Sequence, residues 1–150
     1  MLRSARKLIG LSRAQASALG KAVSLLARAR RQHKSKPIKT ILDAFDTNDS
    51  QSYPPPGLAQ LIAWSIKSAS LRVPWRSDCL IQAMAAAMWL EKLGYSYELK
   101  IGVRKGHDQT LEAHAWLKSG DAIVTGNLPD LETYAHIPTT QAPLQRNAFR

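Results

Sequence analysis

The spacing of hydrophobic residues along this chain changes at Gly94. Before this glycine, apolar residues recur every three or four positions, which is the period of one face of a helix. After it, they alternate with polar residues, which is the period of a strand. The first part therefore predicts helices over residues 12–31, 37–45, 57–71 and 79–93.

The second part predicts three short strands, at 97–104, 111–117 and 122–125. Turn-forming residues at 105–109 and 119–121 connect them, so neighbouring strands are expected to run antiparallel. The predicted fold class is α+β: N-terminal helices come first, and a last helix then packs on a small antiparallel sheet.

The last predicted helix begins at Cys79, the one cysteine of the chain. Asp78 or Ser77 is expected to cap it, because a short side-chain oxygen can accept a hydrogen bond from a free N–H of the first turn. The thiol then lies at the positive end of the helix dipole, which favours the nucleophilic thiolate. Free cysteine is also commonly a small buried hydrophobe, so this position alone leaves a structural role open.

A histidine on a following strand favours the catalytic role. In the segment 111–117, Glu112, His114 and Trp116 share one face of the predicted strand. Cysteine enzymes that transfer acyl groups use a cysteine at a helix start and a histidine on a following strand. The histidine accepts the thiol proton and returns it to the leaving group. Cys79 and His114 are therefore the candidate catalytic pair.

Length and composition limit the remaining possibilities. A chain of 150 residues suits one domain with a single core. One cysteine excludes an internal disulfide and a cysteine-rich zinc site, and it fits a reducing compartment. No apolar run reaches the ~18–20 residues of a membrane span, and the basic N-terminus lacks the continuous apolar core of a secretory signal. We expect a cytoplasmic protein without a metal or another cofactor.

The net charge of +10 is concentrated near the N-terminus. Residues 1–39 hold eleven Lys and Arg and no acidic residue, whereas residues 40–150 hold ten basic and eleven acidic residues. We therefore divide the chain into a basic helical region and linker at 1–52, a catalytic core at 53–138 and a weakly ordered tail at 139–150.

The basic region is interpreted first as a helix that packs on the core and exposes a solvated basic face. Docking of residues 1–39 to an acidic partner or to the anionic surface of a membrane is the alternative. Nucleic acid is not an expected partner, because the region lacks interleaved aromatic residues and any recognisable binding motif. A nucleic-acid or membrane module built on these residues is the least favoured function.

Four motifs recur in a known order. They are Pro-Trp-Arg-Ser-Asp-Cys-Leu at 74–80, Gly-Tyr at 94–95, Ile-Gly-Val-Arg-Lys at 101–105 and Ala-His-Ala-Trp-Leu at 113–117. Together they resemble the transglutaminase-like leader peptidases of lasso peptide biosynthesis, in the stand-alone form whose leader-recognition domain is a separate protein. The resemblance covers about residues 70–128, and the combination of motifs is more specific than any one of them.

This resemblance implies a papain- or transglutaminase-like fold. It implies cleavage of a ribosomally made precursor peptide directly after its leader. The expected partners are that precursor, a separate leader-recognition protein, and an ATP-using lasso cyclase that closes the freed core peptide. The family roles carried over to this chain are the nucleophile for Cys79 and the base for His114.

The third catalytic role is not clear from the sequence. The family has a carboxylate on the strand after the histidine, but residues 121–127 end without an acid. Asn127 is the nearest candidate, because an amide oxygen can also accept a hydrogen bond from the imidazole. Asp121 is close but stands at the start of the strand, and a backbone carbonyl or no third group at all are the other options.

Two tryptophans flank the candidate pair in sequence. Trp75 and Trp116 are predicted to line the substrate cleft, and a role as core aromatics is the alternative. Two other functions stay open. An enzyme with the same Cys79 and His114 can transfer the acyl group to an amine instead of water, and a non-catalytic protein can retain the fold as a binding scaffold.

Overall fold

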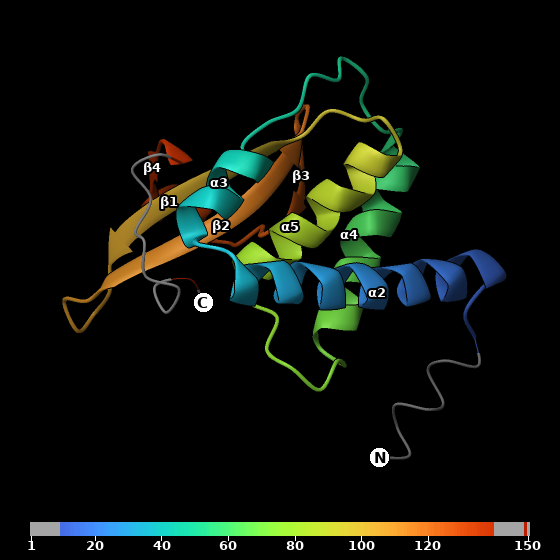
Figure 1. The fold of residues 1–150 in the computed structure, drawn as a ribbon, viewed down its shortest axis with the longest axis horizontal. Helices are drawn as coiled ribbons and strands as arrows, with labels where there is room; N and C mark the ends of the chain where they lie inside the picture. Colours follow the sequence, from blue (N-terminus) through green and yellow to red (C-terminus); the bar gives the residue numbers. More distant parts are fainter. Residues whose placement is uncertain (1–9, 140–148, 150) are drawn as a thin grey trace.

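The computed structural model describes residues 10–139 and 149, and in this part of the chain four helices are followed by a four-stranded antiparallel sheet. Helix α2 runs across α4 and α5, and α5 lies against the sheet (Figure 1). The helices are α2 (Arg13–Ser35), α3 (Ile38–Phe45), α4 (Pro56–Ser70) and α5 (Cys79–Lys92). The strands are β1 (Glu98–Lys105), β2 (Leu111–Ser119), β3 (Ala122–Thr125) and β4 (Ala135–Ile137), and a short 3-10 helix at Leu131–Thr133 precedes β4.

Local sequence determines where the helices begin. Ser12 caps α2 in a reciprocal pair with Gln15: the N–H of Gln15 donates to Ser12 Oγ at 3.2 Å, and the N–H of Ser12 donates to Gln15 Oε1 at 3.0 Å. Helix α4 begins at Pro56, where the missing N–H would have had no partner within the helix. All four predicted helices are confirmed, and α2 continues beyond the predicted end at residue 31 to Ser35.

Helix α5 lies at the centre of the core. Its alanines at 85–87 are fully buried, and they allow neighbouring elements to approach closely. The buried residues lie around most of the helix rather than on the one face that the periodicity predicts. The reason is that α2 and α4 cover the side of α5 that faces away from β2 and β3.

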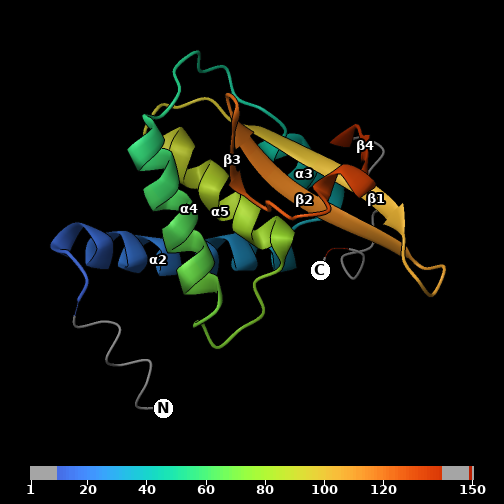
Figure 2. The same cartoon turned by 180° about the vertical axis from the view of Figure 1, so that it is seen from behind.

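The sheet has the strand order β3-β2-β1-β4 (Figure 2). The three predicted strands are confirmed, and β2 is central, with Ala113 to Leu117 buried on both of its faces. Strand β4 was not predicted. It is three residues long, which is too short for an alternating pattern to be recognised, and it pairs with β1 through Val103 and Ala135.

The described part of the predicted basic region packs into the same core. Leu26 of α2 and Ile41 of α3 are buried in one hydrophobic cluster with α5. Asn48 ties the linker that follows to the segment just before β1. Its side chain donates to the carbonyl of Tyr95 at 2.9 Å and accepts from the N–H of Tyr97 at 3.1 Å. A division of the chain at residue 52 stays a prediction.

Most of the predicted tail, 139–150, lies outside the described residues. The two described members are both buried. The hydroxyl of Thr139 donates to the carboxylate of Asp46 at 2.9 Å, and the backbone of Phe149 pairs with Ala113 of β2. In the described part of the chain, no helix is long and apolar enough to cross a membrane.

Candidate active site

Cys79 is the first residue of α5, as predicted, and Asp78 is the residue that caps this helix. The N–H of Ile81 donates to Asp78 Oδ1 at 3.0 Å. Ser77, the other predicted cap, has a different role. Its backbone carbonyl accepts a hydrogen bond from the side-chain amide of Gln82 at 2.9 Å, which fixes the chain just before the helix.

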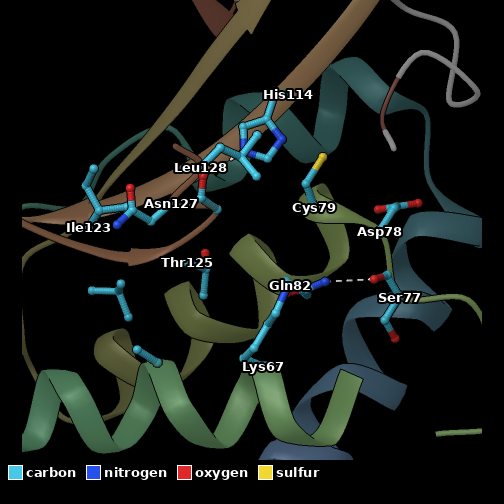
Figure 3. Close-up of a pocket in the computed structure, with 13 residues that line it drawn as sticks. Lys67, Ser77, Asp78, Cys79, Gln82, His114, Ile123, Thr125, Asn127 and Leu128 are labelled. Carbon is cyan, nitrogen blue, oxygen red and sulfur yellow. Dashed lines mark hydrogen bonds between the residues drawn. The ribbon is translucent and has the colours of Figure 1, made fainter. Parts of the chain in front are cut away.

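The thiol of Cys79 faces the central strand of the sheet. Its Sγ accepts a long hydrogen bond from the N–H of Ala115 at 3.4 Å. The neighbouring residue on that strand is His114, and the sulfur points toward its imidazole ring (Figure 3). The packing of α5 on β2 therefore places the two predicted catalytic residues side by side.

A backbone carbonyl orients the imidazole of His114. The ring atom Nε2 lies 2.7 Å from the carbonyl oxygen of Gly126. Because a carbonyl oxygen only accepts hydrogen bonds, Nε2 must carry the proton, and Nδ1 of the neutral ring is then the proton acceptor. This corrects the preferred assignment of Asn127 as the orienting group. Of the options left open, the structure has the backbone carbonyl.

Glycine is required at position 126 for this carbonyl to lie where it does. Gly126 has φ of +79°, a conformation that L side chains rarely adopt. A Cβ atom there would be 2.5 Å from the carbonyl oxygen of Ala115 and 2.7 Å from Cβ of Trp116. The chain after β3 thus approaches β2 too closely for any side chain at this point.

Aromatic rings flank the imidazole. The ring of Trp116 is stacked with that of His114 at 6.1 Å between centroids, and the ring of Tyr134 lies tilted at 5.4 Å. The guanidinium of Arg104 lies 4.4 Å from the centre of the Tyr134 ring. Arg104 also forms ion pairs with Glu112 at 2.9 Å and with Asp130 at 2.5 Å. The contacts of Arg104 with Asp130 and Tyr134 do not follow from the sequence, because they join β1 to the segment before β4.

Burial keeps the thiol of Cys79 and the imidazole of His114, the two candidate catalytic groups, neutral. It raises the pKa of the Cys79 thiol to about 12, and the Asp78 carboxylate acts in the same direction. The N–H groups of Ala115, Leu80 and Cys79 lower this pKa, as expected at a helix start, but by less than burial raises it. Burial also lowers the pKa of His114, against the opposing effect of its hydrogen bond to Gly126. The resting pair at neutral pH is therefore a thiol and a neutral imidazole.

The pair opens into a cavity of about 450 Å³. Asn127 lines this cavity with an exposed side chain, so it is placed to contact a ligand although it does not orient the ring. Trp75 and Trp116 do not line the cavity, and substrate binding by them stays a prediction. The lining residues are Ala63, Lys67, Ser77, Asp78, Cys79, Gln82, His114, Ile123, Val124, Thr125, Gly126, Asn127 and Leu128.

Asp121, the alternative third residue, lies at the other end of β3 and lines a different cavity. A metal site is not formed in the described part of the chain, where no three His, Cys, Asp or Glu side chains lie close enough to share an ion.

The fold and the cavity define the class of protein. A cysteine at the start of a buried helix, packed on an antiparallel sheet that carries a histidine, is the arrangement of papain-like cysteine enzymes. The family model of the transglutaminase-like superfamily matches residues 22–139, and the chain belongs to this superfamily. Its members are typically cysteine-dependent enzymes. The predicted α+β, papain/transglutaminase-like fold is confirmed. Comparison with curated proteins and with solved structures gave no match.

Proposed function

We propose that this protein is a cysteine peptidase that removes the leader from a ribosomally made lasso peptide precursor. The observation that carries the catalytic part is that a cysteine at a helix start and a histidine, whose Nε2 donates to a backbone carbonyl, line the same cavity. The lasso peptide part rests on the four sequence motifs at 74–80, 94–95, 101–105 and 113–117.

The reaction begins from the neutral pair. His114 Nδ1 accepts the proton of the Cys79 thiol as the sulfur attacks the carbonyl carbon of the scissile bond. The imidazolium that forms still donates through Nε2 to the Gly126 carbonyl, which stabilises its positive charge. The N–H of Cys79, at the positive end of α5, donates to the developing oxyanion.

The tetrahedral intermediate collapses when His114 returns its proton to the leaving amine. The C–N bond breaks, the amine-side fragment leaves, and the acyl fragment stays on Cys79 as a thioester. Water then attacks the thioester, and His114 takes a proton from this water and gives one to the departing sulfur. One bond of the substrate is hydrolysed, and the enzyme returns to its starting state.

The proposed partners are a separate leader-recognition protein, which presents the precursor, and a lasso cyclase, which uses the freed core peptide. The basic residues of 1–39 are the proposed contact with an acidic partner or with the anionic surface of a membrane. Helix α2 supports this, because its described surface exposes Arg13, Arg28 and Arg31 and it has no acidic residue.

A second candidate function is acyl transfer. It is favoured by the superfamily to which the chain belongs, because the same thioester on Cys79 can react with an amine. The site chemistry is identical up to that intermediate. The mass of the products separates the two reactions: hydrolysis yields leader and core fragments, whereas transfer yields a conjugate. A non-catalytic scaffold is the third candidate, and the absence of an acid at the end of β3 is what supports it.

The test uses the precursor peptide and the leader-recognition protein that the proposal expects among the neighbouring genes. Leader release is followed by mass spectrometry for the wild type, Cys79→Ala and His114→Ala, with His107→Ala as the control because His107 is an exposed turn residue. We expect release to disappear in the first two variants and to persist in the control. Normal cleavage by Cys79→Ala would assign the protein to the non-catalytic scaffolds.

A further inference from the structure

Strand β3 has one unpaired edge. It lies at the end of the strand order and pairs with β2 on one side only, within the described part of the chain. Helices α4 and α5 lie beside it (Figure 2). An edge strand presents unpaired backbone N–H and C=O groups, which an extended peptide can join as an added strand.

Two cavities meet along this edge. The cavity at Cys79 and His114 has about 450 Å³, and a second one of about 560 Å³ lies toward the start of β3. Ala63 of α4 and Ile123 of β3 line both cavities. The two cavities therefore adjoin between α4 and β3, and we call them together the groove; their linings run along the chain from Asp121 to Gly126.

The chemistry along the groove suits an extended peptide. Its middle is apolar, at Ala63 and Ile123. At its near end, Thr125 is only 6% exposed, and its hydroxyl has no hydrogen-bond partner among the described residues. At its far end, the exposed ring of Tyr53 and the carboxylate of Asp121 form the wall. A polar group of a bound chain can satisfy the hydroxyl, and a basic side chain fits the acidic end.

We propose that the groove holds an extended segment of the substrate, which adds as a strand to the outer edge of β3 and places its reacting carbonyl at Cys79. Strand β3 has four residues, and at about 3.3 Å per residue the groove beside it accommodates a segment of about four to six residues. This proposal rests on the proposed function, because the groove ends at Cys79 and His114. It adds the way in which the substrate peptide is held.

The single cysteine allows a direct test. Probe peptides of one, two, four and six residues are made from alanine and serine, with one cysteine at either the N-terminal or the C-terminal end, each as its disulfide with glutathione. The Cys79 thiolate attacks the probe disulfide, a Cys79–peptide disulfide forms, and glutathione leaves as the thiol. Mass spectrometry of the intact protein gives the exchange equilibrium for each length and each direction.

We expect the exchange equilibrium constant to rise at least tenfold from the one-residue to the six-residue probe in one of the two series, either that with an N-terminal or that with a C-terminal cysteine. In Ala63→Trp, which fills the junction of the two cavities, we expect the ratio between the six-residue and the one-residue exchange equilibria to fall to about one. Ala16→Trp is the matched control, because Ala16 is exposed on α2 and lines neither cavity, and it should behave as the wild type.

Three outcomes would overturn the proposal: no dependence on length, a gain that survives in Ala63→Trp, or a thiol that fails to exchange even with the one-residue probe. A length-dependent gain without any cleavage of the precursor would leave the groove in place and reject the proposed function. Cleavage of the precursor without a length-dependent gain in exchange would support the proposed function and reject the groove.

Methylation of the backbone nitrogens of the six-residue probe separates strand addition from apolar contact. In an antiparallel or parallel ladder, alternate residues of the added strand bond to the edge. N-methyl groups at one alternate set of positions should therefore remove the gain, and those at the other set should leave it. An equal effect at both sets would contradict strand addition.

Discussion

The two sides of the proposed catalytic pair, Cys79 and His114, are built in different ways. On the cysteine side, a neighbour in sequence sets the helix start: Asp78 caps the helix that Cys79 begins, and the sulfur then meets the N–H of Ala115 on β2. On the histidine side, the positioning groups are distant in sequence: Gly126 bonds to the ring of His114, and Tyr134 packs on it. The comparison teaches that a local motif can place a nucleophile, whereas the base depends on the assembled sheet.

This difference has a consequence for how each side tolerates change. On the cysteine side, removal of the Asp78 cap should lower the free energy of unfolding by about as much as one helix cap contributes. The histidine side should fail more severely, because the carbonyl of Gly126 is held by a close backbone approach that a single methyl group prevents. The four predictions that follow test this contrast, in order of decreasing effect.

The largest effect is expected for the base itself. His114→Ala removes the group that accepts and returns the proton, so we expect leader release to fall by about 10³-fold or more. Asn127→Ala should retain activity within about tenfold, because the ring is oriented by a backbone carbonyl and not by this amide. Single-turnover rates measured by mass spectrometry give both values. An Asn127→Ala defect as large as that of His114→Ala would reinstate Asn127 as the orienting group.

The next effect is on stability at Gly126. Gly126→Ala introduces a Cβ atom 2.5 Å from a carbonyl oxygen at a positive φ, and we expect the free energy of unfolding to fall by about 2–4 kcal/mol. Urea unfolding measures it. The matched control is Gly20→Ala within α2, where no atom lies within 4 Å of the added Cβ and a gain of about 0.5–1 kcal/mol is expected. Equal effects at both positions would contradict the close approach.

The cap of α5 gives a smaller effect that separates charge from hydrogen bonding. Asp78→Ala should lower the free energy of unfolding by about 1 kcal/mol, whereas Asp78→Asn should keep the cap. Both variants should lower the pKa of Cys79, because the Asp78 carboxylate raises it. Ultraviolet absorbance of the thiolate during a pH titration reports that pKa. An unchanged thiol pKa in Asp78→Asn would show that the carboxylate has no influence on the sulfur.

The smallest effect is the contribution of His114 to the pH dependence of stability. Burial lowers the pKa of His114 in the folded protein below its ordinary value of 6.5, so the unfolded chain binds the proton more readily. This contribution is complete above pH 6.5 and declines as the pH falls below it. Urea unfolding of the wild type and of His114→Gln at several pH values should give curves that diverge below pH 6.5. Parallel curves would mean that the folded protein does not lower this pKa.

Most of the fold could be predicted because its elements are long enough to show a period. The helix at 79–93 and the strand at 111–117 were located this way, and with them Cys79 and His114. The third catalytic group could not be identified, because every residue has a carbonyl and the sequence does not mark which one a fold will use. Gly126 was visible in the sequence only as a turn residue after the third strand.

The contacts of Tyr134 could not be predicted from the sequence for a related reason. They require the three-residue strand β4 to pair with β1, and a strand of that length leaves no periodic signal. The ion pair of Arg104 with Glu112 joins paired residues of the predicted strands β1 and β2. Its ion pair with Asp130 joins β1 to a segment before β4, and the sequence does not indicate that these two segments meet.

The stacking of Trp116 on His114 supplies the protein with its own optical reporter. The indole is buried, and its ring lies nearly parallel to the imidazole at 6.1 Å between centroids. A protonated imidazole is a cation beside the indole, whereas a neutral one is not, so the surroundings of the Trp116 ring change with the charge on His114. The ring of His136 lies as near, at 6.2 Å, and the chain has four tryptophans. In a variant that keeps Trp116 as its one tryptophan and lacks His136, the emission should therefore follow the charge on His114 without an attached label.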